Sequence, residues 1–342
     1  MTLPAGTPRC IDGQGPASSD DAPWLIVGAG ALGQLFAASL AAFRPVILLG
    51  RHLAQPAIRL RKVDGTDVEI ALARERLKDW IAKRGEYSVP ALVVLATKSH
   101  DTQTALDALT PSLAPTTPLL LLQNGFQVQP RISEHWAGPV LCASTTEAAY
   151  RPMPEPKPKP KPKPEPEGDS HSDFHLSRPD VVHAAAGETW IGDLAGRHAA
   201  LATVVADDLS QAGIAATACA DIRLRLWHKL AINAVINPLT ASHGVRNGEL
   251  TRVEFRPRIE ALISEIDRIM RAEGIKPPAA GWQALIDGVI EATAANRSSM
   301  LQDVLAGRPT ERDAILWPLI DAGLRHELAT PALTALYRAT LA

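Results

Sequence analysis

The spacing of apolar residues changes along the chain, from short buried strands in the first half to helices in the second. Residues 24–27, "WLIV", predict a fully apolar strand, and residues 31–43 after the glycines have the small-and-large spacing of a helix packed on a sheet. Further apolar strands are predicted at 45–51, 91–98, 118–125 and 138–150, with a helix from about 101 to 113. This alternation predicts a doubly wound α/β fold with right-handed crossovers between parallel strands.

The second half of the chain predicts a different architecture. Strand character returns at 181–192, and a helix follows near 197–213. From residue 221 onward almost every segment has helical spacing. Helices are predicted at 221–241, 254–273, 279–295, 297–305 and 310–326, with a final one within 330–342. The chain therefore predicts an α/β domain followed by an all-helical C-terminal domain.

Two polar segments lie outside this pattern. Residues 152–173 alternate Pro with Lys or Glu, a composition that favours extended polyproline II and cannot pack a core. Because strand character resumes after it, we interpret this segment as a loop insertion, either solvated or a docking site for a partner domain. Residues 1–22 are predicted to be a disordered extension. The predicted domains are then 23–219, which contains the insertion, and 220–342.

Composition narrows the class of function. Of 342 residues, 46% are hydrophobic and 21% are charged, which is typical of a globular protein with two domains. The formal net charge of −2 gives no basic field for nucleic acid or an anionic membrane, so we expect a small-molecule substrate and leave a homodimer open. Three cysteines with no C-x-x-C and no metal-ligand spacing favour a reducing compartment, the cytoplasm, and no metal.

One segment raises the alternative of a membrane span. Residues 23–43 contain no charged side chain, and a segment of this length is nearly long enough to span a bilayer. Their glycines argue for a turn instead.

The six residues of a G-x-G-x-x-G motif lie after the first predicted strand and before the first predicted helix. They are Gly28, Ala29, Gly30, Ala31, Leu32 and Gly33. In this context the motif predicts a Rossmann-type dinucleotide site, because glycines allow close approach of a pyrophosphate to a helix N-terminus.

The end of the second predicted strand selects among dinucleotides. An NAD site normally places a carboxylate there for the ribose hydroxyls, whereas "LLGRH" supplies Arg51. A guanidinium matches a phosphate in charge and in forked geometry. We therefore predict NADPH as the cofactor, against the alternative that Arg51 is a surface residue without a ligand.

Polar residues also follow two other predicted strands, Lys98 after "VVLAT" and Asn124 after "LLLLQ". In parallel sheets, ligands bind outside the carboxyl ends of the strands. Each residue alone could simply begin a turn. Because both flank the same crevice, we predict that they contact the nicotinamide or the substrate.

A polar stripe lies on an otherwise apolar helix in "RLWHKLAINAVINPLTASHG". Lys229, Asn233 and Asn237 are four residues apart, so they share one helix face. A solvated helix edge would carry more charge, and a buried lysine is costly without a polar surrounding. We therefore predict that the stripe faces a polar cavity. Ser299 and Glu311 lie further on and are either site residues, surface residues or helix caps.

Six motifs together resemble the ketopantoate reductase (2-dehydropantoate 2-reductase) family. They are "GAGALGQL", "ATKSHDT", "LLLLQNGF", "LWHKLAINAVINPLTA", "NGEL" and "SSMLQDVLAGRPTERDAI", and they extend from about residue 24 to about residue 325. The resemblance implies an NADP-dependent oxidoreductase that reduces 2-dehydropantoate to (R)-pantoate in pantothenate and coenzyme A biosynthesis. Neither the insertion nor the N-terminal extension interrupts one of these motifs.

The resemblance also implies residue roles. Lys229 matches the family's general acid, Glu311 matches a glutamate that assists in the active site, and Asn233, Asn237 and Ser299 match residues that bind substrate. It places Lys98 and Asn124 by the cofactor and substrate, and Arg51 at the 2′-phosphate. The chemistry is consistent, because reduction of a 2-keto carbon leaves negative charge on oxygen, and a protonated lysine stabilises and neutralises it.

Two other functions remain open from the sequence. The same fold and chemistry could serve another small 2-keto acid, because the pocket walls can vary while the acid stays. A non-catalytic cofactor-binding scaffold could instead recruit a partner through residues 152–173. The polar residues predicted for the site argue against this scaffold.

Overall fold

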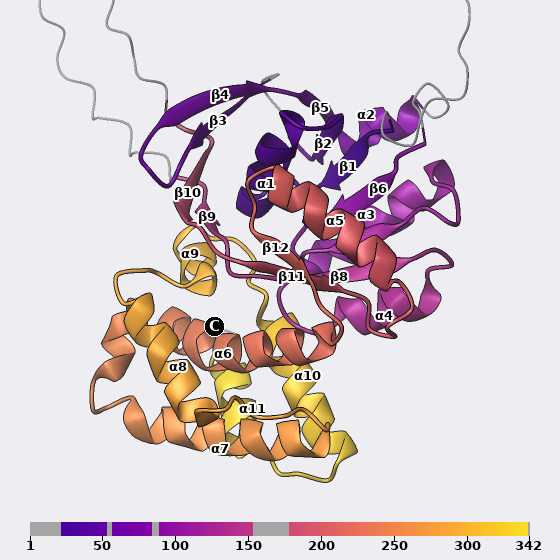
Figure 1. Ribbon diagram of the computed structural model, residues 1–342. Coiled ribbons are helices and arrows are strands. Elements are labelled where there is room, and N and C mark those ends of the chain that lie inside the picture. The colour runs from indigo at the N-terminus through magenta and orange to yellow at the C-terminus, as the bar shows by residue number, and fades with distance from the viewer. Residues whose placement is uncertain (1–21, 53–56, 84–88, 153–177, 341–342) are drawn as a thin grey trace, which may run out of the picture.

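The structure is a computed structural model that describes residues 22–52, 57–83, 89–152 and 178–340. Almost all of the predicted extension at 1–22 and of the proline-rich insertion at 152–173 lies outside these residues. The strands are arranged as one large sheet and one small sheet, and helices follow from residue 222 to the C-terminal part of the chain. Figure 1 shows the sheets at the top and these helices below.

The large sheet has eight strands in the order β12-β11-β8-β7-β6-β1-β2-β5. Its strands are β1 (Trp24–Val27), β2 (Val46–Gly50), β5 (Ala73–Arg76), β6 (Leu92–Leu95), β7 (Leu119–Leu121), β8 (Val140–Thr145), β11 (Thr189–Gly192) and β12 (Ala216–Ala218). Neighbours are parallel except β8 and β11, which are antiparallel. The chain order therefore reverses direction between β6 and β1, as in a doubly wound fold.

Both faces of the large sheet are covered, which explains why its central strands β1, β2, β6 and β7 are buried along their whole length, whereas the edge strand β5 is polar. In β1, Trp24 and Ile26 point into a core that includes side chains of α1 (Ala31–Ala41) and α5 (Ala199–Gln211). Leu25 and Val27 point to the opposite face. That face is covered by α2 (Leu77–Ala82), α3 (Ser99–Leu109) and α4 (Val128–His135), and α3 continues as a 3₁₀ turn, η1 (Thr110–Ser112).

The small sheet was not predicted from the sequence. Its order is β4-β3-β10-β9, with β3 (Ala57–Arg61), β4 (Asp67–Ala71), β9 (Ala148–Tyr150) and β10 (Val181–Ala185). Ile58 and Leu60 of β3 and Val181 of β10 share the core of α1. The prediction of one strand at 138–150 was therefore wrong, and the strand character at 181–192 belongs to two strands. Each segment contributes one strand to the large sheet and one to the small sheet, because the chain turns at residues 146–147 and 186–188.

The helices after residue 221 were placed by the sequence close to their observed bounds. They are α6 (Ile222–His243), η2 (Asn247–Thr251), α7 (Arg256–Ala272), α8 (Gly281–Ala292), α9 (Ser299–Leu305), α10 (Arg312–Arg325) and α11 (Pro331–Ala339). α6 is the central helix, and its side chains share one apolar core with α7, α8, α10 and α11. Among the described residues, no helix is both long and apolar enough to cross a membrane.

The long helix α6 joins this helical core to the large sheet. Asp221 caps its start by accepting a hydrogen bond of 3.0 Å from the Leu224 backbone N–H, and Gly244 ends it with a φ of +65°. Ile222 and Leu226 lie in the core beneath the sheet, whereas Leu230 and later residues lie in the helical core. The second turn of α6 thus lies at the boundary between the two cores.

Candidate active site

The turn between β1 and α1 has the backbone that the glycine motif predicted. Gly28 has a φ of +117°, and a Cβ there would lie 2.7 Å from the backbone of Ala96. A Cβ on Gly33 would lie 1.9 Å from the carbonyl oxygen of Gly28, so helix and strand approach too closely for any side chain. Gly30 has no atom nearer than 4.0 Å to its ideal Cβ and is exposed. The turn therefore closes on the protein side and is open on the solvent side.

This turn has backbone donors available for an anion. Gly30 is the N-cap residue of α1, and no side chain caps the first turn, which contains Ala31 and Leu32. Uncapped amides at a helix N-terminus bind phosphate groups through N–H donors and the helix dipole. Gln34 reaches back to donate to the carbonyl oxygen of Ala29 at 3.1 Å, which fixes the turn. The residues present therefore fit a pyrophosphate.

Arg51 lies directly after β2, at the same edge of the sheet. Its side chain is 79% exposed, and its only ion pair among the described residues is at 3.3 Å to Asp101 in the first turn of α3. An exposed pair of this kind contributes little free energy and is easily replaced. The guanidinium is thus accessible to a phosphate beside the glycine turn.

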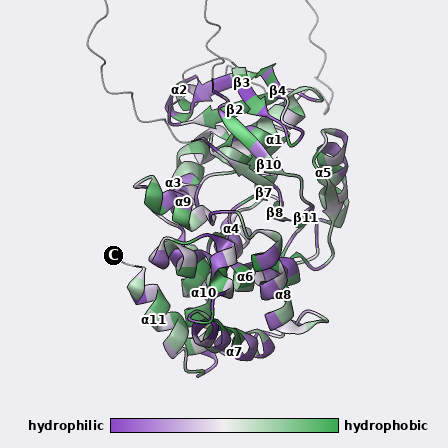
Figure 2. Ribbon diagram, turned by 90° about the vertical axis from the view of Figure 1, so that its left-hand side faces the viewer, coloured by the Kyte–Doolittle hydropathy of each residue, from purple (hydrophilic) through white to green (hydrophobic). Residues whose placement is uncertain are grey.

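Two predicted residues, Lys98 and Asn124, meet at Glu311, the N-cap position of α10. Its carboxylate accepts four hydrogen bonds from the ends of β6 and β7. The donors are Ser99 N at 3.1 Å and Ser99 Oγ at 3.0 Å to Oε1, and Lys98 Nζ at 3.4 Å and Asn124 Nδ2 at 3.3 Å to Oε2. Figures 1 and 2 show α9 between the sheets above and the other C-terminal helices below, and Lys98 also donates to Asp303 of α9 at 2.7 Å. The predicted crevice residues are therefore bound to the helical part of the chain.

The charges in this cluster are set by their neighbours. Burial alone would raise the pKa of Glu311, but the Lys98 ammonium and the donors of Ser99 and Asn124 outweigh it, so the pKa is lowered. Burial would likewise lower the pKa of Lys98, but Glu311 and Asp303 outweigh it, and the pKa is raised. Both groups are therefore charged at neutral pH.

Lys229 has the opposite behaviour. Its Nζ donates to the backbone oxygen of Thr145, the last residue of β8, at 2.8 Å, and it forms no ion pair among the described residues. Burial lowers the pKa of Lys229 to about 8, although Glu311 partly counteracts this by raising it. Of the two lysines in the site, Lys229 is the one that can both carry and release a proton near neutral pH.

The rest of the α6 stripe offers unpaired amides. Asn237 is only 7% exposed and Asn233 is half-buried, yet neither side chain has a hydrogen-bond partner within the described residues. Because neither amide is fully enclosed by protein atoms, each is free to bind a ligand or water. One turn further on, Thr240 Oγ1 lies 3.0 Å from the Asn237 backbone oxygen and 2.7 Å from Ser298 Oγ, within hydrogen-bond distance of both.

Ser299 is the first residue of α9 and is exposed, and within the described residues its side chain forms no hydrogen bond with the other predicted residues. The helix cap is instead Ser298, whose Oγ accepts a hydrogen bond of 3.1 Å from Leu301 N. Because Ser298 is bound to Thr240, the start of α9 still lies next to the α6 stripe.

Three residues of the site were not predicted from the sequence, namely Ser99, Thr145 and Asp303. Asp303 is 3% exposed and lies between Lys98 and Arg308, whose Nε is 3.1 Å from Oδ1. A signal was available for this residue, because it stands four residues after Ser299 and therefore shares a helix face with a predicted site residue, the same spacing that marked Lys229. Thr145 contributes only its backbone oxygen to Lys229, so its residue type could not have indicated this contact.

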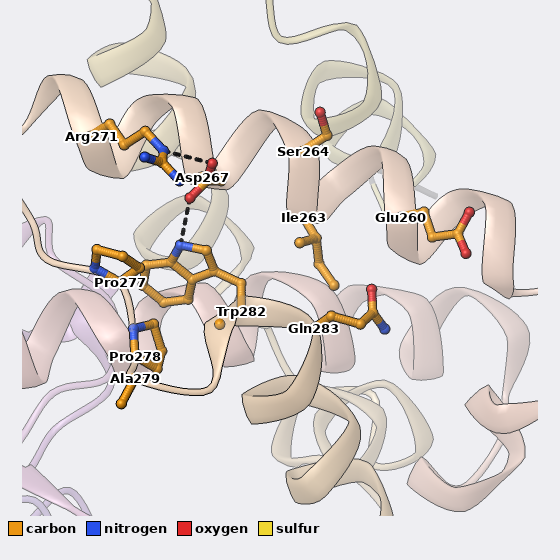
Figure 3. Close-up of a pocket in the computed structure, with 11 residues that line it drawn as sticks. Glu260, Ile263, Ser264, Asp267, Arg271, Pro277, Pro278, Ala279, Trp282 and Gln283 are labelled. Atoms are coloured by element: carbon orange, nitrogen blue, oxygen red, sulfur yellow. Dashed lines mark hydrogen bonds and ion pairs between the residues drawn. The ribbon is translucent and has the colours of Figure 1, made fainter.

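A surface hollow of about 500 Å³ lies elsewhere, between α7 and α8 (Figure 3). None of the predicted site residues lines it. The Asp267 carboxylate in this hollow already accepts hydrogen bonds from Arg271 Nε at 2.8 Å and Trp282 Nε1 at 3.0 Å, as Figure 3 shows. We therefore place the candidate site at the sheet edge and the α6 stripe rather than in this hollow.

Comparison with known proteins gives a consistent result over both parts of the chain. The family model "Ketopantoate reductase PanE/ApbA" matches residues 24–156, and the model "Ketopantoate reductase PanE/ApbA C terminal" matches residues 221–342. The 2-dehydropantoate 2-reductase of Vibrio cholerae is 34% identical over 318 residues, which is 92% of this chain and 95% of that protein.

Solved structures share the fold over nearly the whole chain. A PanE/ApbA family ketopantoate reductase from Ralstonia eutropha has a TM-score of 0.75 at 25% identity and covers 93% of this chain and 97% of its own. A D-mandelate dehydrogenase in complex with NADH and anilino(oxo)acetate has a TM-score of 0.76 at 21% identity, with 93% of this chain and 96% of that chain covered. At this identity the second likeness concerns the fold alone.

Proposed function

Because the chain belongs to the ketopantoate reductase family, we propose that it reduces 2-dehydropantoate to (R)-pantoate with NADPH, within pantothenate biosynthesis. Residues 23–219 form the nucleotide-binding domain in this proposal, and residues 220–342 form the catalytic domain. The observation that carries it is the α6 stripe, where Lys229, with a pKa of about 8, stands beside the unpaired amides of Asn233 and Asn237.

The nucleotide is proposed to bind at the carboxyl edge of the large sheet. Gly28 and Gly33 keep the backbone clear, the first-turn amides of α1 bind the pyrophosphate, and Arg51 binds the 2′-phosphate. When bound there, NADPH supplies the hydride for the carbonyl carbon. Lys98 and Asn124 lie at the ends of neighbouring strands, where the nicotinamide end belongs.

The proton is proposed to come from Lys229. Reduction of the substrate ketone leaves negative charge on its oxygen, and the Lys229 ammonium stabilises that charge and then transfers a proton to it. A pKa of about 8 keeps most of the lysine protonated at neutral pH, while its proton is more readily released than that of an exposed lysine. Lys98 is a weaker candidate because its two carboxylate partners raise its pKa.

Substrate orientation is assigned to uncharged groups. Asn233, Asn237 and the exposed hydroxyl of Ser299 can bind the carboxylate and terminal hydroxyl of the substrate without adding charge. Glu311 is proposed to act on the lysines rather than on the substrate. Its two oxygens already accept four hydrogen bonds, which is about the full capacity of a carboxylate.

The test is a comparison of substrates and cofactors with the purified full-length chain. We expect the highest kcat/KM with 2-dehydropantoate and NADPH, a lower value with NADH, and (R)-pantoate as the product. A higher kcat/KM with another small 2-keto acid would establish that acid as the substrate instead. The fold is compatible with this outcome, because a D-mandelate dehydrogenase shares it. No turnover with any 2-keto acid would refute the reductase assignment.

A further inference from the structure

The contact that holds Lys229 depends on a turn at the end of β8. The Thr145 backbone oxygen accepts the Lys229 hydrogen bond, and the Thr145 side chain is itself held on both sides. Its Oγ1 accepts from Thr189 Oγ1 at 2.8 Å and from Glu147 N at 3.1 Å. The position of the Lys229 amine is thus tied to the conformation of residues 145–147.

A second turn, between β10 and β11, presses on the first. Thr146 N donates to Glu188 O at 2.9 Å, and Glu188 N donates to Thr146 Oγ1 at 2.8 Å. A Cβ on Gly187 would lie 2.3 Å from the carbonyl carbon of Thr146, so the two backbones meet without room for a side chain. The two turns behave as one packed unit beside the site.

One buried acid–base pair closes this unit on its small-sheet side. The Glu147 side chain is 2% exposed, and His183 Nε2 of β10 lies 2.6 Å from its Oε2. A carboxylate can only accept, so His183 donates this bond. Glu147 has no other side-chain partner within the described residues. Because a buried carboxylate is costly without its partner, the position of each residue depends on the other.

We propose that Glu147 and His183 are positioning residues for Lys229: the pair holds the turn at 145–147 so that the Thr145 carbonyl receives the lysine. This inference rests on the proposed function of Lys229 as the proton donor. Neither residue is placed in contact with substrate, because both lie behind the turn, with side chains that are 2% and 15% exposed. A misplaced carbonyl would release the amine from the position at which it meets the substrate oxygen.

The experiment combines kinetics with direct titration of Lys229 by NMR in protein labelled at lysine. Glu147→Ala is expected to lower kcat by roughly 10- to 10²-fold, as a small displacement of a reacting group does, with little change in the KM for NADPH. It is also expected to lower the pKa of Lys229, because a hydrogen bond to the carbonyl favours the charged amine. Glu147→Gln retains an acceptor oxygen and should recover part of both effects.

Controls separate positioning from a general loss of stability. Glu69→Ala removes an exposed carboxylate from β4 of the same small sheet and should leave kcat and the Lys229 pKa unchanged. His183→Ala should reproduce the effect of Glu147→Ala, and the double variant should be no worse than either single variant, as expected for a coupled pair.

The outcomes are distinguishable from those that test the reaction itself. A Lys229 pKa that stays at the wild-type value or rises in Glu147→Ala would overturn the positioning role, whatever the substrate. If Glu147→Ala does not fold, the same criterion applies to His183→Ala, which removes the other partner of the pair. A wild-type protein that fails to turn over 2-dehydropantoate would refute the proposed function but not this readout, because the titration requires no substrate.

Discussion

Gly125 sits where the sheet edge meets the helical part of the site. It follows Asn124 and has a φ of +84°, and its ideal Cβ would lie 2.1 Å from the carbonyl oxygen of Ala314 in the first turn of α10. The next residue, Phe126, donates its N–H to that same oxygen at 3.2 Å. Glu311 begins α10, so Gly125→Ala must separate Asn124 from Glu311.

The size of the effect follows from these distances. The backbones must move apart by about 0.9 Å for the contact to reach 3.0 Å, the shortest distance that real Cβ atoms show. A displacement near 1 Å in a reacting geometry costs on the order of 10²-fold in kcat. In the free energy of unfolding, the positive φ costs about 1–2 kcal/mol, and the forced contact adds about 1–3 kcal/mol.

Gly213→Ala is the matched control. Gly213 has a φ of +83°, almost the same as Gly125, but no atom lies within 4 Å of its ideal Cβ. Both variants therefore incur the backbone strain, and only Gly125→Ala incurs the contact. Steady-state kcat and thermal unfolding would be measured for both, together with NADPH binding by fluorescence. If the two variants had equal kcat values, the close approach of the two parts would have no role in catalysis.

Four further predictions concern single site residues. Arg51→Ala should raise the KM for NADPH with little change for NADH, and an equal loss with both cofactors would contradict the phosphate assignment. For the wild-type protein, kcat should fall above about pH 8 as Lys229, with a pKa of about 8, loses its proton. Glu311→Gln should move this descending limb to lower pH, because Glu311 raises the Lys229 pKa; a limb that stays in place or moves up would count against that coupling. Asn237→Leu should lower kcat/KM for 2-dehydropantoate by at least about tenfold. Its thermal stability should stay equal or rise, because the Asn237 amide has no partner within the described residues. A loss of stability without a kinetic effect would make Asn237 a structural residue.

Features that depend on local spacing were predictable from the sequence. The stripe on α6 follows from residues four apart, and the glycine turn follows from a motif bounded by a strand and a helix. The family resemblance added the roles of Lys229 and Glu311, which spacing alone did not supply. These roles and those of the other site residues stay predictions until they are measured.

Features that depend on distant pairing were not predictable in the same way. The strand β4 alternates exposed and half-buried residues, a recognisable pattern, but its sheet is completed by β10, more than 100 residues further along the chain. Asp303 and Lys98 are 205 positions apart in the sequence, so neither residue predicts its contact with the other. Near Thr146 the chain passes from β8 of the large sheet to β9 of the small sheet. Which sheet each strand joins depends on its pairing partners, and these lie in other segments of the sequence.

The role of Lys229 as proton donor is tested most directly by the rate of NADPH oxidation by Lys229→Ala with 2-dehydropantoate, measured in a single turnover beside the wild-type protein. We expect that the variant still binds NADPH and that its rate falls by roughly 10²- to 10⁴-fold, the usual range for a lost general acid. A rate within about threefold of the wild type would contradict this role, because that loss is far below what a general acid contributes.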